Sequence, residues 1–157
     1  MKLISPNITW AEAIRSDTAK RAGINNYFNI EQLARMTLLA GKVFEPLRLH
    51  FNVPIFISSF FRNHDVNELI GGAFNSQHMA NNGAAMDLDA EVYGGVTNKQ
   101  LFEYIKDNLE FDQLIWEFGN DGEPDWVHAS YNEGHNRKEI LKAKRTTAQM
   151  VTYEKYK

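Results

Sequence analysis

The sequence predicts an α+β fold, with a mainly antiparallel sheet flanked by helices, in a single domain that spans residues 1–157. Three observations support this prediction. The length of 157 residues suffices to bury one hydrophobic core. Apolar residues at helical spacing occupy the first third of the chain, whereas most of the later segments are short extended runs. Helices followed by strands with few crossovers are typical of the α+β class.

The amino-terminal third contains two helix starts. Thr9 and Glu12 have the spacing of a capping box and predict a short helix that continues through Ile14. Asn29 is a good cap for a longer helix, in which Pro46 should kink or tighten the last turns. The core-facing stripe of this helix comprises Leu33, Met36, Leu39, Ala40, Val43 and Leu47.

A strand and a long polar segment follow. Pro54 precedes residues 55–61, which are rich in β-branched and aromatic side chains and predict a strand. Residues 63–82 are polar and contain glycine, so we expect a loop with a short helix over residues 66–70. Long ordered loops often carry function.

The middle of the chain predicts a strand and then a helix. Residues 84–89 alternate small or apolar side chains with acidic ones, which places Asp87 and Asp89 on one face of a half-buried strand. Thr97 and Gln100 form a second capping box, and the helix it opens should extend to Leu109.

Two strand-like runs, residues 111–118 and 126–131, are separated by a turn rich in Gly, Asn, Asp and Pro. They predict a hairpin or two neighbouring antiparallel strands. The tail over residues 138–156 is ambiguous, with one further strand expected near residues 150–153.

Composition narrows the function. No apolar run approaches the roughly 20 residues of a membrane span, and the amino terminus lacks the stretch of a secretory signal, so we expect synthesis in the cytoplasm and no membrane insertion. A net charge of −3 gives no general attraction for nucleic acid. A local basic run is interpreted as a solvated face rather than a polyanion site; it contains Arg137, Lys138, Lys142, Lys144 and Arg145. Because the chain has no cysteine, any metal must be held by His, Asp or Glu.

The strongest functional candidates are His78, Asp87 and His128. Two imidazoles and a carboxylate can hold a zinc ion and leave one coordination position open, which is the pattern of catalytic zinc sites. Hydrolysis of an amide also requires a base, and Asp125 is the acidic residue nearest to His128 in sequence. Two glutamates, Glu117 and Glu123, remain alternatives for the base.

Arg62, at the end of the first predicted strand, could bind a substrate carboxylate or polarise a carbonyl oxygen. His64 has a small chance of lining the same cleft, whereas His50 and His135 have no supporting context and are interpreted as structural or exposed. No helical His-Glu-x-x-His motif, phosphate-binding loop or dinucleotide fingerprint is present.

Taken together, these residues resemble the zinc D-alanyl-D-alanine peptidase family, which includes phage endolysins and belongs with the hedgehog-like metallopeptidases. The family pattern Ser-x-His, then Gly-x-Ala-x-Asp, and later an acidic residue three positions before a His, is matched by Ser76, His78, Gly83, Ala85, Asp87, Asp125 and His128. Further parts of the chain that are similar to the family are residues 45–48, residues 58–62, Asn67, Gly71 and Gly72.

The resemblance implies zinc bound by His78, Asp87 and His128, with Asp125 as general base. It also implies that Arg62 binds substrate and polarises its carbonyl group, and that Ser76 is a polar support on the substrate side of the site. The implied substrates are peptidoglycan stem or cross-link peptides, cleaved by a D,D-carboxypeptidase or an endolysin-type endopeptidase. We therefore expect a monomer that acts on the cell wall in the periplasm or outside the cell, of bacterial or phage origin.

The sequence departs from the family pattern at two points. The separation of nine positions between His78 and Asp87 is two residues longer than in the pattern, so residues 81–82 should form a bulge, with Asp89 as the fallback ligand. The base is Asp where relatives often have Glu. Trp126 also stands where some branches have a second His.

Two other functions remain open. The first is a non-catalytic, zinc-containing module of the same fold that binds the cell wall. The second is a phage structural component that carries the fold without metal or wall affinity.

Overall fold

The computed structural model describes residues 2–157 and shows an α+β fold. The helices found in this part of the chain are α1 (Trp10–Ala13), α2 (Asp17–Ala22), α3 (Ile30–Leu39), α4 (Glu45–Phe51), α5 (His64–Leu69) and α6 (Asn98–Asn108), with shorter helical turns η1 (Ala40–Phe44), η2 (Gln77–Met79) and η3 (Ala90–Val92). The strands are β1 (Leu3–Ser5), β2 (Ile8–Thr9), β3 (Phe56–Ser59), β4 (Ala84–Asp89), β5 (Gln113–Glu117), β6 (Trp126–Tyr131), β7 (Glu139–Arg145) and β8 (Val151–Lys155).

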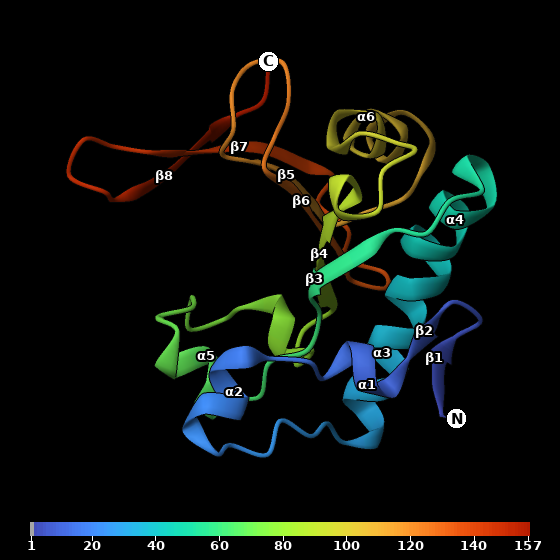
Figure 1. Cartoon of the computed structure of the whole chain (residues 1–157), viewed down its shortest axis with the longest axis vertical. Coiled ribbons are helices and arrows are strands. Elements are labelled where there is room, and N and C mark those ends of the chain that lie inside the picture. The colour runs from blue at the N-terminus through green and yellow to red at the C-terminus, as the bar shows by residue number, and fades with distance from the viewer. Residues whose placement is uncertain (1) are drawn as a thin grey trace.

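The main sheet has six strands in the order β3-β4-β6-β5-β7-β8, and β1 pairs with β2 in a separate small sheet (Figure 1). Every neighbouring pair of the main sheet is antiparallel except β5 and β7, which run parallel. The prediction of a mainly antiparallel sheet flanked by helices is therefore confirmed.

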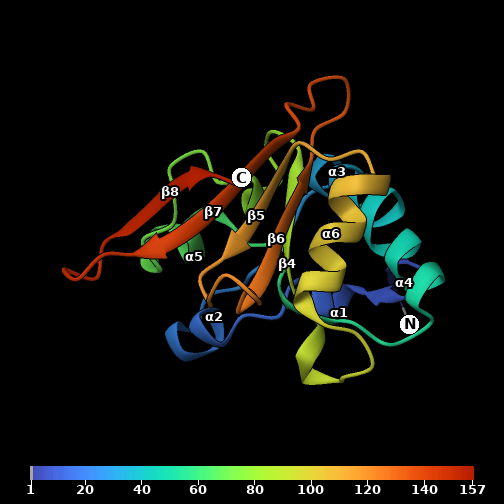
Figure 2. The same cartoon turned by 90° about the horizontal axis from the view of Figure 1, so that it is seen from above.

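One face of this sheet is covered by helices and the other carries polar side chains. Figure 2 shows α3, α4 and α6 together on one side, whereas α2 and α5 lie on the other. Because side chains alternate along a strand, the covered face receives apolar residues that are all buried: Met86, Leu88, Leu114, Trp116, Val127 and Ala129. Trp116 meets Phe102 of α6 edge to face, with ring centroids 5.3 Å apart.

The long helical segment that starts at the predicted cap, Asn29, is continuous but locally widened. A capping box of Asn29 and Gln32 begins α3. The π-helical turn η1 then joins α3 to α4, and Pro46 stands in the first turn of α4. Because the segment is continuous, the missing N–H of proline leaves one carbonyl of the preceding turn without its helical donor, and the π-helical turn lies at that point. The expected disturbance therefore lies just before Pro46 rather than after it. Within residues 2–157, no helix is both long and apolar enough to span a membrane.

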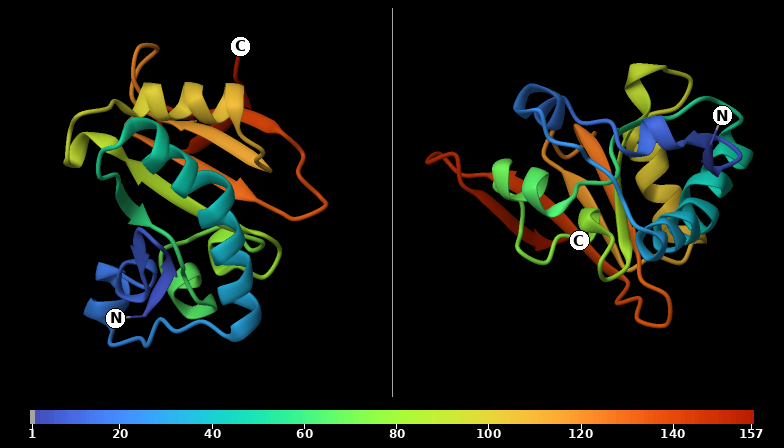
Figure 3. Two further views of the ribbon diagram at one scale, coloured as in Figure 1. Left: turned by 90° about the vertical axis from the view of Figure 1, so that its right-hand side faces the viewer. Right: turned by 90° about the horizontal axis from the view of Figure 1, so that it is seen from below.

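Several predicted bounds are confirmed closely, among them strand β4, strand β6 and both capping boxes that involve threonine. The short strands β1 and β2 and helix α2 were not predicted. The interpretation of the tail was wrong in one respect, because the tail contains the strand β7 as well as the expected β8. The right-hand view in Figure 3 shows this β7–β8 hairpin extending beyond the body of the sheet.

Candidate active site

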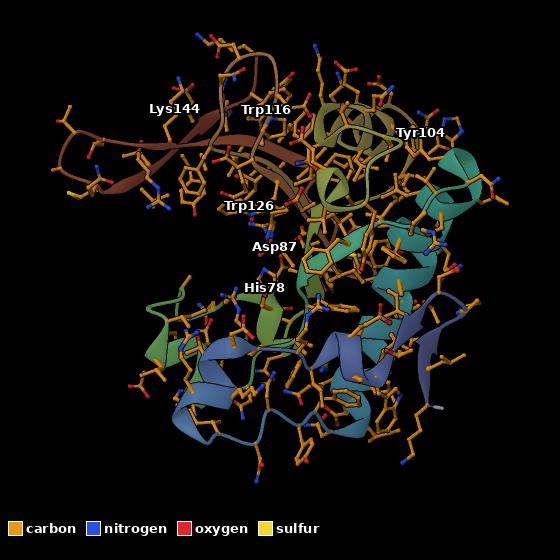
Figure 4. The ribbon with its side chains drawn as sticks, viewed as in Figure 1. His78, Asp87, Tyr104, Trp116, Trp126 and Lys144 are labelled. Carbon is orange, nitrogen blue, oxygen red and sulfur yellow. The ribbon has the colours of Figure 1, made fainter. Side chains whose placement is uncertain are left out.

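Three side chains from separate segments converge on the polar face of the sheet. His78 Nε2 lies 3.3 Å from Asp87 Oδ1, and His128 Nδ1 lies 3.0 Å from the same oxygen. Asp87 and His128 are directly paired residues of β4 and β6, so the sheet register sets their approach. Figure 4 shows His78, Asp87 and Trp126 near one another at the centre of the molecule, away from Trp116 and Tyr104.

His78 is held by the loop that precedes β4. Its Nδ1 donates a 2.8 Å hydrogen bond to the carbonyl oxygen of Phe60, and its own carbonyl accepts the N–H of Arg62. Ser76 caps the turn η2 by accepting the backbone N–H of His78. The contact with Phe60 orients the ring and the other two hold the main chain of His78, so the Nε2 atom faces Asp87.

The two extra residues before Gly83 form a bulge that is clamped by α3. Ala80 adopts a left-handed conformation with φ of 54°. Gln32 donates to the carbonyl of Met79 and to the side chain of Asn81, and Arg35 donates to the carbonyl of Ala80. The longer spacing therefore leaves His78 beside Asp87, and Asp89 is not needed as a substitute ligand.

Gly83 is required where this bulge enters β4. Its φ is +74°, and a Cβ atom at this position would lie 2.6 Å from the carbonyl oxygen of Tyr131. Only glycine combines this backbone conformation with such a close approach to β6. Gly83 thus permits the pairing of β4 with β6 that brings Asp87 to His128.

The charges of the three residues suit a cation. Burial lowers the pKa of the His78 imidazole, so this ring is neutral at neutral pH. Burial alone would raise the pKa of Asp87, but the hydrogen bond and the charge of His128 act in the opposite direction; the pKa of this carboxyl group is held well below its usual range, and the carboxylate is ionised. Since Nδ1 of His78 carries the proton, the Nε2 lone pair and an Asp87 oxygen lone pair face each other across 3.3 Å.

This opposition is relieved by a cation that accepts both lone pairs, which is what a zinc ligand set requires. Ligand atoms about 2.0–2.2 Å from a tetrahedral ion are about 3.3–3.6 Å from one another. The observed separations of 3.3 and 3.0 Å are close to that range. The residues present therefore fit a zinc ion bound by two nitrogens and one carboxylate oxygen.

Glu117 is the acidic side chain that the structure brings to this cluster. It lies on β5 opposite Trp126, one step along the sheet from the pair Ile115–His128, and on the same face as His128. Diagonal neighbours of this kind have Cα atoms about 7–8 Å apart. Burial raises the pKa of Glu117 to about 7, with the charge of His128 opposing and that of Asp87 adding to the increase. A carboxyl group with this pKa can exchange protons near neutral pH.

Asp125 occupies a different position. It lies in the turn before β6, is exposed, and its main chain is bonded through its N–H to Glu117 and through its carbonyl to Asn98. Within residues 2–157 its carboxylate forms no hydrogen bond or ion pair with His78, Asp87 or His128.

The other predicted alternatives are engaged elsewhere. Glu123 accepts the N–H of Lys99 at the start of α6. Asp89 caps η3 and accepts the side chain of Asn98. Both carboxylates therefore stabilise local structure through these partners.

Arg62 lies at the edge of the cluster. Burial lowers the pKa of its guanidinium, and the charge of Asp87 opposes this effect, which places the two side chains in electrostatic range. Its Nε atom is buried and has no hydrogen-bond partner among residues 2–157. A buried donor without a partner is costly, so a ligand that accepts from Arg62 would be favoured.

The remaining histidines lie outside the cluster. His50 stacks on Tyr104 with ring centroids 4.0 Å apart, which agrees with a structural role. His64 is exposed and paired with Asp65, and His135 is exposed in the loop after β6. Glu117 was an alternative candidate for the base, but no local pattern in the sequence indicated that it lies near the cluster, because strand pairing determines its position.

Comparison with protein families identifies a relationship over most of the chain. A model of the family described as Peptidase M15 matches residues 6–130, a range that includes His78, Asp87 and His128 and ends before β7. A comparison with curated proteins gives no match. The match covers well over half of the sequence and agrees with the α+β fold and with the convergent His-Asp-His group. The chain belongs to the peptidase M15 family and is a metallopeptidase.

Proposed function

We propose that this protein is a zinc peptidase that hydrolyses peptide bonds in peptidoglycan stem or cross-link peptides, as a D,D-carboxypeptidase or an endopeptidase. The observation that carries the proposal is the convergence of one nitrogen of His78 and one of His128 on the same oxygen atom of Asp87, in a chain of the M15 family. Such a substrate implies that the protein acts at the cell wall.

His78, Asp87 and His128 are the proposed zinc ligands. Bound there, zinc would supply a Lewis acid that polarises a carbonyl group and makes a water molecule acidic near neutral pH. The protein contributes the orientation of the ligands through Phe60 and the sheet register, and it contributes the proton transfers described below.

Glu117 is the proposed general base, in place of Asp125. A base must take a proton from the attacking water and return it to the leaving amine, so its pKa should lie near the working pH. Glu117 is buried on the face that carries His128, and its pKa is raised by burial. Asp125 is exposed in the turn beyond Trp126, which is a less suitable environment for this task.

Arg62 is proposed to bind the substrate carbonyl oxygen as negative charge develops on it. Arg62 is partly buried, the charge of Asp87 acts on its guanidinium, and its buried Nε lacks a hydrogen-bond partner among residues 2–157. A donor that is already fixed in a partly buried site stabilises an oxyanion more effectively than a solvated one.

The test is digestion of purified peptidoglycan and of synthetic stem peptides, with mass spectrometry of the products. The wild-type protein should release new amino termini, and a chelator should stop the release. Glu117→Gln should lower the rate by about 100-fold or more while zinc remains bound. Asp125→Asn should have a smaller effect than Glu117→Gln on the rate of cleavage of at least some of these substrates.

Three outcomes would contradict parts of this proposal. Retention of zinc without any cleavage by the wild type would indicate a non-catalytic binding module. Full activity of Glu117→Gln together with loss of activity in Asp125→Asn would return the base to Asp125. Cleavage that is insensitive to chelation would exclude a zinc mechanism.

A further inference from the structure

The basic run near the carboxyl terminus contains one side chain that is not paired. Four of its five cations have acidic partners: Arg137 with Asp112, Lys138 with Glu110, Lys142 with Asp121, and Lys144 with Glu154. Arg145 has no carboxylate within 4.0 Å among residues 2–157. Instead, its guanidinium carbon lies 4.3 Å from the centroid of the Phe118 ring. Stacking of this kind orients the guanidinium while leaving its planar N–H groups free.

Arg145 lies on the same face of the sheet as the candidate active site. Glu117 pairs with Ala143, and Arg145 follows Ala143 by two positions on β7, so strand alternation gives both residues of β7 the same side. Lys144 has the opposite orientation, and Figure 4 shows its side chain pointing away from His78 and Asp87. The charge of Arg145 also acts on the Glu117 carboxyl group.

A pocket of about 490 Å³ lies at the ends of β5 and β7, and Arg145 is one of its lining residues. Its walls are the turn between β5 and β6 and the end of β7, with Phe118, Asp125 and Arg145 among the lining residues. Phe118 directly follows Glu117 in sequence, and the N–H of Asp125 is bonded to the carbonyl of Glu117. Two of the residues that line the pocket are therefore attached directly to the proposed base, one by a peptide bond and one by a main-chain hydrogen bond.

Two charges of opposite sign remain unpaired in this pocket. Asp121 and Lys142 neutralise each other, and Lys144 is paired with Glu154. Among the charged residues that line the pocket, this leaves Asp125 and Arg145, neither of which has an ion-pair partner within the described chain. A ligand group with one ammonium and one carboxylate would complement both.

We propose that this pocket binds the free amino-acid end of a substrate side chain, with Arg145 binding the carboxylate and Asp125 the ammonium group. The inference rests on the proposed function, because it concerns the peptide that the active site would cleave. Among stem peptides, a diaminopimelate residue has such an end, with both groups on one carbon, whereas a lysine residue offers the ammonium group alone. Arg145 would therefore select diaminopimelate-containing peptides over lysine-containing ones.

The experiment compares two synthetic stem peptides that differ only in diaminopimelate or lysine at one position. Binding is measured by calorimetry to the zinc-loaded Glu117→Gln protein, and kcat/KM is measured for the wild type. We expect the diaminopimelate peptide to bind about 10-fold more tightly or better, which is typical of one charge-assisted carboxylate contact. Arg145→Ala should abolish this preference, and Arg145→Lys should restore only part of it, because lysine lacks the planar fork.

Two further variants complete the design. Asp125→Asn should weaken the binding of both peptides, because both carry the ammonium group. Lys99→Ala removes one positive charge from α6, on the opposite face of the sheet, and should leave the preference unchanged. This control separates a specific contact from a change in net charge.

The inference is overturned if neither peptide binds, if the two peptides bind equally, or if Arg145→Ala retains the preference. Failure of this inference and failure of the proposed function give different results. A wild-type protein that prefers the diaminopimelate peptide in binding but cleaves neither peptide would contradict the peptidase activity and leave the pocket assignment intact. Cleavage of both peptides at equal kcat/KM, with equal binding, would do the reverse.

Discussion

The imidazole of His78 donates a 2.8 Å hydrogen bond to the main-chain carbonyl of Phe60. Because a carbonyl oxygen only accepts, Nδ1 must carry the proton, and Nε2 is left as a lone pair directed toward Asp87. Phe60 directly follows strand β3, which pairs with the strand of Asp87. The sheet therefore determines both the position of one proposed ligand and the tautomer of another.

This arrangement predicts that the protein binds one zinc ion and that each ligand is necessary. Loss of a hydrogen-bond partner of a metal ligand typically lowers metal affinity by about 10- to 100-fold. His78→Ala, Asp87→Asn and His128→Ala remove a ligand itself, so each should lower zinc affinity by more than this. Elemental analysis and competition with a chromogenic chelator would measure the effect. His135→Ala removes an exposed imidazole and should bind zinc as the wild type does. Equal zinc content in all four variants would exclude this site.

Glu117 predicts a pH-dependent stability of the metal-free protein. Burial raises its pKa from 4.5 to about 7, so the folded state disfavours the charged form. The stability associated with the protonated carboxyl group is present below about pH 4.5 and is lost as the pH rises through about 7. Glu117→Gln should therefore increase the free energy of unfolding by up to about 3 kcal/mol near pH 8.5 and by little near pH 4.5.

Urea unfolding of the metal-free wild-type and Glu117→Gln proteins across this pH range measures the difference. Glu103→Gln replaces a carboxylate of α6 that is paired with Lys99 in a solvent-accessible position, and it should show no such increase. A difference between Glu117→Gln and the wild type that is constant with pH would show that Glu117 is not the group that titrates.

Arg62 should act on the rate of the chemical step. Arg62→Lys keeps the positive charge but loses the planar set of donors, so kcat should fall by about 100-fold or more with a smaller change in KM. Steady-state kinetics on a synthetic stem peptide would separate the two parameters. Arg21→Lys on α2 is the matched control, because this arginine is exposed and its side chain is hydrogen-bonded only to Thr18 among residues 2–157. An increase in KM alone would assign Arg62 to ground-state binding of the substrate.

The parts of the fold that could be predicted from the sequence are those specified by local signals. The capping boxes at Thr9 and Thr97 use neighbouring residues, and the alternation over β4 needs no knowledge of its partners. The spacing of His78, Asp87 and His128 was informative for the same reason, since each residue lies in a short segment with a distinctive composition.

The parts that could not be predicted depend on pairing between distant strands. Glu117 approaches His128 only because β5 pairs with β6 in one particular register, and a shift of one residue would direct Glu117 to the other face. Strand β7 was missed because its alternation of apolar and basic residues is partly concealed by charges on both faces. Its parallel pairing with β5, which brings Arg145 to the site, has no local signal at all.

Gly83 provides a test of how closely the bulge must approach β6. Gly83→Ala should lower the free energy of unfolding by about 3 kcal/mol or more, because the added Cβ combines a positive φ with a 2.6 Å contact to the carbonyl of Tyr131. Gly134→Ala has the same φ of +74° but no atom within 4 Å, so it should cost only about 1 kcal/mol. Thermal and urea unfolding would measure both. Because displacement of the Gly83 turn moves β4 relative to β6, we also expect Gly83→Ala, and not Gly134→Ala, to weaken zinc binding. Equal costs for the two substitutions would mean that the left-handed conformation, rather than the close approach, determines the glycine at position 83.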